Sequence, residues 1–168
     1  VFNAKVDGSQ DLTLAAGTGT ITFNAAVGSA NVIGDGTGAA ITINSGATTF
    51  NATLATGSGI TSSADVTFKD NVTIGAGDTA STLNANTTLN KAAGLTFTSA
   101  GHVSFGDAST DQVTLSGPVT ITTATANTNQ VYNAKVDGSQ DLTLAAGTGT
   151  ITFNAAVGSS NVIGDGTG

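Results

Sequence analysis

The chain has 168 residues and a formal net charge of −7, yet only 9% of its residues are charged and it contains no Cys. Four Lys residues cannot neutralise a phosphate backbone, so this balance argues against nucleic acid as a partner and against an anionic membrane surface. With 39% hydrophobic residues and a modest net charge, the composition also lacks the signature of intrinsic disorder.

A long internal repeat sets the organisation of the chain. Residues 1–38 return almost unchanged as residues 131–168, with differences only at Phe2/Tyr132 and Ala30/Ser160. We therefore divide the chain into residues 1–130, one full repeat of a continuous array, and residues 131–168, the start of the next repeat. Because Met is absent, an initiator included, we expect a mature fragment cut from a longer protein. No apolar run approaches the roughly 18 residues of a membrane span, so we expect no membrane insertion in this segment.

Short strands are predicted wherever an apolar residue, Thr or Ser, and a second apolar residue follow one another. Side chains alternate between the two faces of a strand, so the outer two residues point inward and the central hydroxyl residue faces solvent. Gly, Asn, Asp and Ser fill the intervening turns, and strong helix formers are nearly absent, which predicts an all-β chain. In chain order, the triplets begin at Leu12, Ile21, Ile41, Val66, Val72, Leu95, Val103, Val113, Val119, Leu142 and Ile151.

The spacing of the strands predicts how they stack. Strand starts at Val1, Ile21 and Ile41 are evenly spaced, and a second series with the same step falls between them. Two strands per coil of about 20 residues, repeated in register, predict a parallel β-solenoid in which a 130-residue period holds six or seven coils. A string of β-sandwich domains is the competing fold, but it would have longer strands, a buried Trp and proline-marked linkers, and Pro118 is the only proline.

Two polar features add detail to this prediction. Asn3, Asn24 and Asn44 each follow the last inward residue of a strand, at nearly equal steps along the chain. Their amides either stack from coil to coil, as in cross-β ladders, or serve a left-handed turn. The change from Phe2 to Tyr132 adds one hydroxyl, and we expect the tip of that ring to reach solvent.

A catalytic site is not predicted. The β-helical lyases and hydrolases need clustered carboxylates with a basic partner, whereas Lys5, Lys69, Lys91 and Lys135 are scattered and the Asp residues fall mostly in turns. His102 is the sole histidine, which precludes a His-based triad or a multi-His metal site, and we expect it at an exposed strand edge. We therefore predict no catalytic and no cofactor-binding residues, and not an enzyme.

Two acidic segments resemble parts of calcium loops. Asp7–Asp11, and its copy Asp137–Asp141, place side-chain oxygens at alternate positions, as the start of a calcium loop does. A full loop has Gly at position 6 and Glu at position 12, but Leu12 and Thr18 stand there. Ile33–Gly38 is similar to a calcium-binding nonapeptide, but it occurs once per long period. We interpret these segments as turns and predict no metal ligand; weakly bound calcium stays an open alternative.

Three segments carry a family resemblance: NQVYNAKVDGSQDLTLAAGTGTITFNAAVG, LTFTSAGHVSFG and VTLSGPVTITT. They resemble the repeats of very large bacterial surface proteins of the filamentous haemagglutinin and β-strand-repeat type. The resemblance implies a right-handed β-helix and a secreted adhesin, sheath or matrix component at the bacterial cell surface. By that resemblance, the export signal and any anchor lie outside this segment, and no functional residue is carried over.

The predicted function is structural: a repeat segment of an adhesin shaft, or of a self-assembling extracellular fibre. Its expected partners are further copies of itself, joined end to end or laterally, and a host or neighbouring-cell surface. The main alternative is a carbohydrate- or receptor-binding module of a surface protein. Two minor alternatives are a phage tail-spike shaft and, because Thr residues face outward, an ice-binding solenoid.

Overall fold

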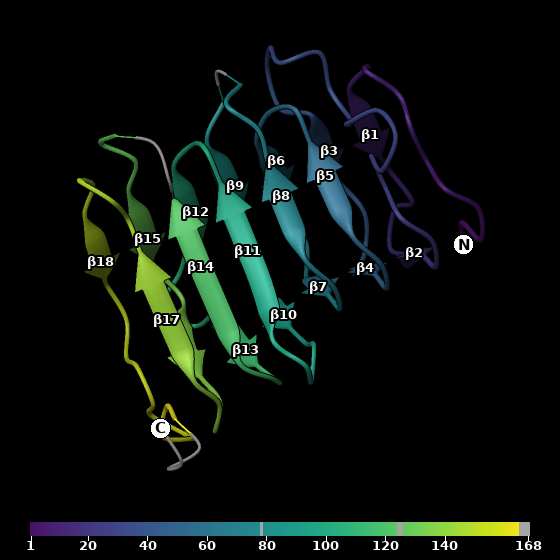
Figure 1. The fold of residues 1–168 in the computed structure, drawn as a ribbon. Coiled ribbons are helices and arrows are strands. Elements are labelled where there is room, and N and C mark those ends of the chain that lie inside the picture. Colours follow the sequence, from purple (N-terminus) through teal and green to yellow (C-terminus); the bar gives the residue numbers. More distant parts are fainter. Residues whose placement is uncertain (78, 124–125, 165–168) are drawn as a thin grey trace.

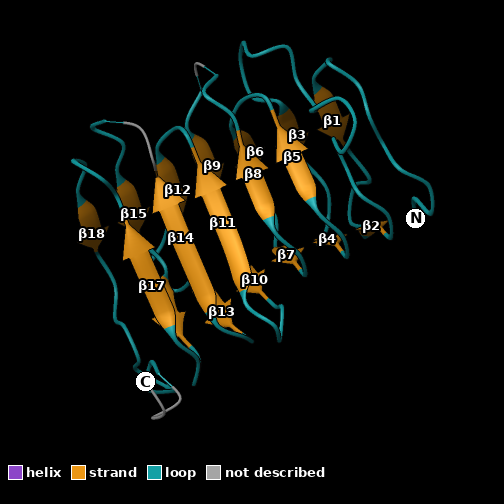
Figure 2. Cartoon of the chain, in the orientation of Figure 1, coloured by secondary structure: helices purple, strands orange, loops and turns teal. Residues whose placement is uncertain are grey.

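The regular secondary structure of the described residues consists of short parallel strands. The computed structural model describes residues 1–77, 79–123 and 126–164, and within these ranges it contains 18 strands and no helix (Figures 1 and 2). The strands stack in successive coils of about 23 residues. The predicted fold class, an all-β parallel β-solenoid, is therefore confirmed.

Three sheets form the three sides of the solenoid, and the five-stranded sheet is nearest to the viewer in Figure 1. The seven-stranded sheet contains β1 (Leu12–Leu14), β3 (Ile41–Ile43), β6 (Ile60–Ser62), β9 (Ser81–Leu83), β12 (Val103–Phe105), β15 (Gln130–Tyr132) and β18 (Ile151–Phe153). The six-stranded sheet contains β2 (Ile21–Phe23), β4 (Thr48–Phe50), β7 (Val66–Phe68), β10 (Thr87–Leu89), β13 (Gln112–Leu115) and β16 (Lys135–Asp137). The five-stranded sheet contains β5 (Leu54–Thr56), β8 (Val72–Ile74), β11 (Leu95–Ser99), β14 (Val119–Thr123) and β17 (Leu142–Ala145). Each coil thus passes from the seven-stranded to the six-stranded and then to the five-stranded sheet.

A coil has three sides, one more than the sequence spacing predicted. The starts Ile21 and Ile41 lie in different sheets, so the step between them does not measure a coil. Coil length also varies, because the chain from Ile21 to its register partner Thr48 is longer than the chain from Thr48 to its own next partner, Val66. The turns absorb this variation, since the inward residues of each strand stay in register with those of the next.

The core is a narrow column of Val, Ile, Leu and Phe side chains. In β3, Ile41 and Ile43 are fully buried, while Thr42 between them is half-buried on the outer surface, as the apolar–Thr–apolar pattern predicts. Inside the column, the seven Phe rings and the one Tyr ring form an unbroken chain of ring contacts. Its members, in order, are Phe2, Phe23, Phe50, Phe68, Phe97, Phe105, Tyr132 and Phe153, with centroids 4.6 to 5.8 Å apart.

Asn side chains form a ladder along one corner of the solenoid. The Asn24 amide donates to Oδ1 of Asn3 at 2.7 Å, and the Asn51 amide donates to Oδ1 of Asn24 at 2.7 Å. The third rung is therefore Asn51, and the prediction of Asn44 was wrong because Asn44 follows β3, in the seven-stranded sheet. Among the described non-glycine residues, only Asn127 has a positive φ, of 62°. Amide stacking, and not left-handed turn geometry, accounts for the ladder positions.

Candidate functional site

The first Asp of the Asp-Gly-Ser-Gln-Asp motif holds a turn of the next coil. Asp7 Oδ1 accepts the backbone N–H of Ala30 at 2.8 Å, and Asp137 Oδ1 accepts that of Ser160 at the same distance. These backbone hydrogen bonds stabilise the charged form and lower the pKa of both carboxyls. Both copies of the motif therefore stabilise a turn through the same hydrogen bond, as the sequence predicted.

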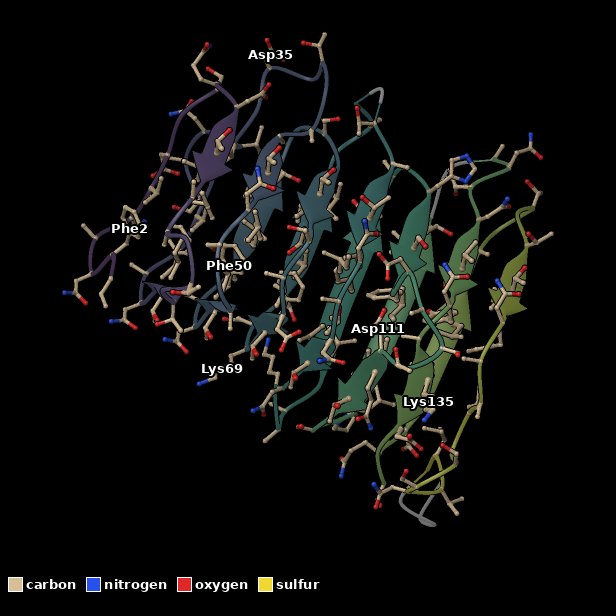
Figure 3. The ribbon with its side chains drawn as sticks, turned by 180° about the vertical axis from the view of Figure 1, so that it is seen from behind. Phe2, Asp35, Phe50, Lys69, Asp111 and Lys135 are labelled. Carbon is tan, nitrogen blue, oxygen red and sulfur yellow. The ribbon has the colours of Figure 1, made fainter. Side chains whose placement is uncertain are left out.

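The second acidic segment is also organised by local hydrogen bonds. Asp35 Oδ1 accepts the backbone N–H of Thr37 at 2.9 Å and its hydroxyl at 2.6 Å, and the hydroxyl is the main cause of the lowered pKa of Asp35. In the described ranges, His, Asp and Glu side chains do not gather in groups of three or more that could hold a metal ion. Figure 3 places Asp35 at the upper edge of the molecule, away from Lys69 and Lys135 in its lower half.

One of the scattered lysines has a specific partner. Lys91 Nζ lies 2.7 Å from Asp70 Oδ1 and 3.0 Å from Asn71 Oδ1. The hydrogen bond from Lys91 lowers the pKa of Asp70. Asn71 Oδ1 also accepts the backbone N–H of Thr96, so this cluster joins successive coils at one corner. The pair is half-exposed, and ion pairs of this kind contribute little to stability.

His102 is exposed, as expected, and it bonds to the next coil. Its Nδ1 accepts the backbone N–H of Asn129 at 3.0 Å, and Asn129 Oδ1 accepts the backbone N–H of Thr150 at 2.9 Å. His102 and Asn129 therefore perform the same task in consecutive coils. This arrangement makes His102 a structural side chain at a corner of the solenoid.

A buried polar network around Tyr132 was not predicted. The Tyr132 ring is fully buried, and its hydroxyl donates to Gln130 Oε1 at 3.0 Å, so the expectation that the ring tip reaches solvent was wrong. Gln130 Nε2 in turn donates to the carbonyls of Ala145 at 2.9 Å and Ile121 at 3.2 Å. Burial raises the pKa of the Tyr132 hydroxyl far above its ordinary value. The sequence held one signal for this contact. Gln130 and Tyr132 are two residues apart, and residues two apart in a strand share a face.

Rows of hydroxyl side chains run along the outer faces of all three sheets, interrupted at positions such as Ala55 in β5 and Val131 in β15. The central Thr residues of neighbouring strands pair in register, as Thr22 does with Thr49 in the six-stranded sheet. The sequence predicted one outward Thr per strand. In the five-stranded sheet, however, β11 and β14 carry two each, with Thr96 opposite Thr120 and Thr98 opposite Thr122. These faces are therefore polar and, over these strands, uncharged.

The two end coils expose apolar residues that equivalent positions bury. At the C-terminal end, Phe153 and Val157 are 40% and 45% exposed, whereas Phe23 and Val27, which occupy the same positions of the repeated block, are 1% exposed. At the other end, Phe2 is 42% exposed and Tyr132 is fully buried. Each end thus presents a surface that the chain covers with a further coil elsewhere.

The fold defines a class, the parallel β-solenoids, and no particular member of it. No pocket is found in the described ranges, and no helix there is long and apolar enough to cross a membrane. No family model, curated protein or solved structure matches this chain. The functional argument therefore rests on the repeat, the stacking and the surfaces.

Proposed function

We propose that this chain is a structural segment of an extracellular fibre or adhesin shaft at a bacterial cell surface. The observation that carries the proposal is the repeated block: residues 131–164 continue the same three sheets that residues 1–34 begin. Periods of this kind add coil upon coil along one axis, so that more periods make a longer rod of constant width. Extent along one axis is the property that a shaft or fibre requires.

The side chains identified above support a mechanical role. Three kinds of hydrogen bond connect one coil to the next: those of the Asn ladder, those that Asp7 and Asp137 accept from backbone N–H groups, and the one that His102 accepts from Asn129. The ring chain does the same through the core. Carbohydrate recognition, the alternative, commonly uses exposed aromatic rings, but Phe2 and Phe153 in the end coils are the exposed rings of this chain. No observation favours the alternative.

The proposal is tested by adding periods. Chains extended after Gly168 by one, two and three copies of residues 39–168 would each be longer by about 27 Å per added period, at about 4.8 Å per coil, with an unchanged cross-section. Small-angle X-ray scattering measures both quantities. A matched control exchanges inward Val, Ile and Phe for the neighbouring outward Thr within the added period, which keeps its composition.

The control chain is expected to gain flexible mass without gaining rod length. If the unmodified extensions instead behave as separate compact bodies on flexible linkers, the shaft proposal is wrong.

A further inference from the structure

Identical sequences occupy different sides of this solenoid. The Ile-Thr-Phe triplet forms β2 in the six-stranded sheet at its first occurrence and β18 in the seven-stranded sheet at its second. The Leu-Thr-Leu triplet forms β1, which pairs with β3 in the seven-stranded sheet, and then β17, which pairs with β14 in the five-stranded sheet. Both triplets move by one side, in the same direction.

The number of sides in one period explains the shift. Sixteen strand positions separate β2 from β18, and one further side is formed by Val27, which bridges in parallel to Leu54 of β5 without a named strand of its own. One 130-residue period therefore makes seventeen sides, which at three sides per coil is five and two-thirds coils. This is close to six coils, the lower of the two numbers predicted, because the coils, of about 23 residues, are longer than the sequence spacing predicted. Each period is thus one side short of six full coils. As a result, each residue of the second copy lies one side earlier in its coil than the equivalent residue of the first copy.

The aromatic chain follows this shift through the core. Phe23, Phe50 and Phe68 stack in the six-stranded sheet with nearly parallel rings. Phe97 in the five-stranded sheet then makes edge contacts, at 5.8 Å, to Phe68 and to Phe105.

From Phe105, the stacking continues in the seven-stranded sheet, onto Tyr132 and then Phe153. The chain of ring contacts thus begins the first period at Phe2, beside the six-stranded sheet, and the second period at Tyr132, in the seven-stranded sheet.

We infer that successive periods of this protein are related by a threefold screw: a rotation of one third of a turn with a rise of about 27 Å. A surface feature that occurs once per period therefore points in three directions in turn and returns to the same side after three periods. The segments held by Asp7 and Asp137 illustrate this. Val27, three residues before the Ala30 that Asp7 holds, bridges to Leu54 of the five-stranded sheet, whereas its copy Val157 bridges to Val136 of the six-stranded sheet.

The same triplet can form any of the three sides because all three sides require the same pattern of residues. Every side requires two inward residues around an outward one, and the backbone hydrogen bonds of a parallel pair do not depend on side-chain identity. Ile21 and Phe23 pair with Thr48 and Phe50, whereas their copies pair with Gln130 and Tyr132. The side that a triplet occupies is therefore set by the number of sides that precede it.

Engineered disulfides in the full chain test the rotation, and the chain has no Cys of its own. Val131 is the register partner of Ser104 in β12, and both side chains are partly exposed on the outer face. The double variant Ser104→Cys/Val131→Cys is expected to oxidise almost completely, and Thr114→Cys/Val131→Cys hardly at all. Were the second block on the same sides as the first, position 131 would lie beside Thr114 of β13, and the outcomes would be reversed.

Thr82→Cys/Ser104→Cys, a register pair within the first period, is the positive control. Equal oxidation of both test pairs, or failure of both while the control forms, would overturn the inference. Spin labels on the same pairs give the same ordering without requiring a bond: the 104–131 distance must be the shorter of the two.

The extension to many periods rests on the proposed function and has a separate test. A chain of residues 1–130 repeated three times and followed by residues 131–168 carries Asp35→Cys in each full period, labelled with gold particles. Electron micrographs are expected to show labels projecting in three directions along a rod. Labels along one edge would contradict the screw, whereas a string of compact bodies would contradict the shaft and leave the disulfide result standing.

Discussion

Tyr132 and Gln130 show how much depends on single residues in a narrow core. Both side chains are fully buried, and each polar atom of the pair has a partner within the coil or in the next one. A buried polar group costs free energy when it is unpaired, so these two residues stabilise this coil only as a pair. The first block has Phe2 at the position of Tyr132, so the two copies of the block differ in the chemistry of their core.

Alkaline conditions are predicted to destabilise the chain through Tyr132. Burial raises the pKa of Tyr132 above its ordinary value of 10.0, so above that pH the unfolded chain ionises this residue and the folded chain does not. The unfolded state then binds fewer protons, and the free energy of unfolding falls by about 1.4 kcal/mol for each further pH unit. Below that pH, the contribution is complete.

Because Tyr132 is the only Tyr and there is no Trp, phenolate absorbance during a pH titration reports this residue alone. Ionisation should coincide with loss of the β-sheet circular dichroism signal. The Tyr132→Phe variant should lose that signal less steeply with pH. Ionisation of a still-folded chain near pH 10.0, the ordinary value, would contradict the prediction.

At the scale of the strand, the sequence pattern located some elements and missed others for a physical reason. Apolar–Thr–apolar triplets such as Leu12–Leu14 and Ile151–Phe153 all form strands. Several of the missed strands have polar inward residues: Thr48 in β4, Ser81 in β9 and Gln130 in β15, all fully or almost fully buried.

Hydrogen bonds that no pattern reveals make such positions tolerable, as when Ser81 Oγ accepts the backbone N–H of Ile60. Without these strands, the spacing indicated two sides per coil instead of three. Among the candidate site residues, the turn role of Asp7 and Asp137 was predictable because Asp favours turns. The bond between His102 and Asn129 was not, since it depends on which residues lie in adjacent coils.

The Asn ladder yields a prediction with an internal control. Asn24 donates to Asn3 and accepts from Asn51, so Asn24→Ala is expected to lower the free energy of unfolding by about 1 kcal/mol. Asn44 also follows a strand and is exposed, but its side chain forms no hydrogen bond within the described ranges, so Asn44→Ala should change stability little. Urea unfolding followed by circular dichroism compares the two. Equal effects would show that the ladder contributes nothing.

At the scale of the whole molecule, the sides of the solenoid are well covered, whereas the first and last coils of residues 1–168 expose apolar side chains. Along the sides, backbone groups pair from strand to strand, and Thr rows face outward. At the ends, the terminal strands have unpaired edges, and Ile151, Phe153 and Val157 remain 37%, 40% and 45% exposed. Open sheet edges next to apolar side chains favour pairing with a further strand.

We expect residues 1–168, produced by themselves, to associate end to end as their concentration rises. Phe153→Asp should suppress the association, because it places a charge in the apolar end surface. Thr152→Asp is the matched control, since it adds the same charge to the outer face of the same strand. Sedimentation velocity measures the average mass. A wild-type chain that stays monomeric at every accessible concentration, or equal suppression by both variants, would count against this prediction.

The seventeen-sided period has a consequence for how such a gene can change. Recombination between the stretches that encode the near-identical residues 1–38 and 131–168 would delete or duplicate one period and leave the strand pattern continuous at the joint. The encoded rod would then differ in length and also in azimuth, since everything beyond the joint would be turned by a third of a revolution. On the inferred screw, copy-number variation in this repeat would thus re-aim whatever lies beyond the joint, while the parallel strand pairing continues along the rod.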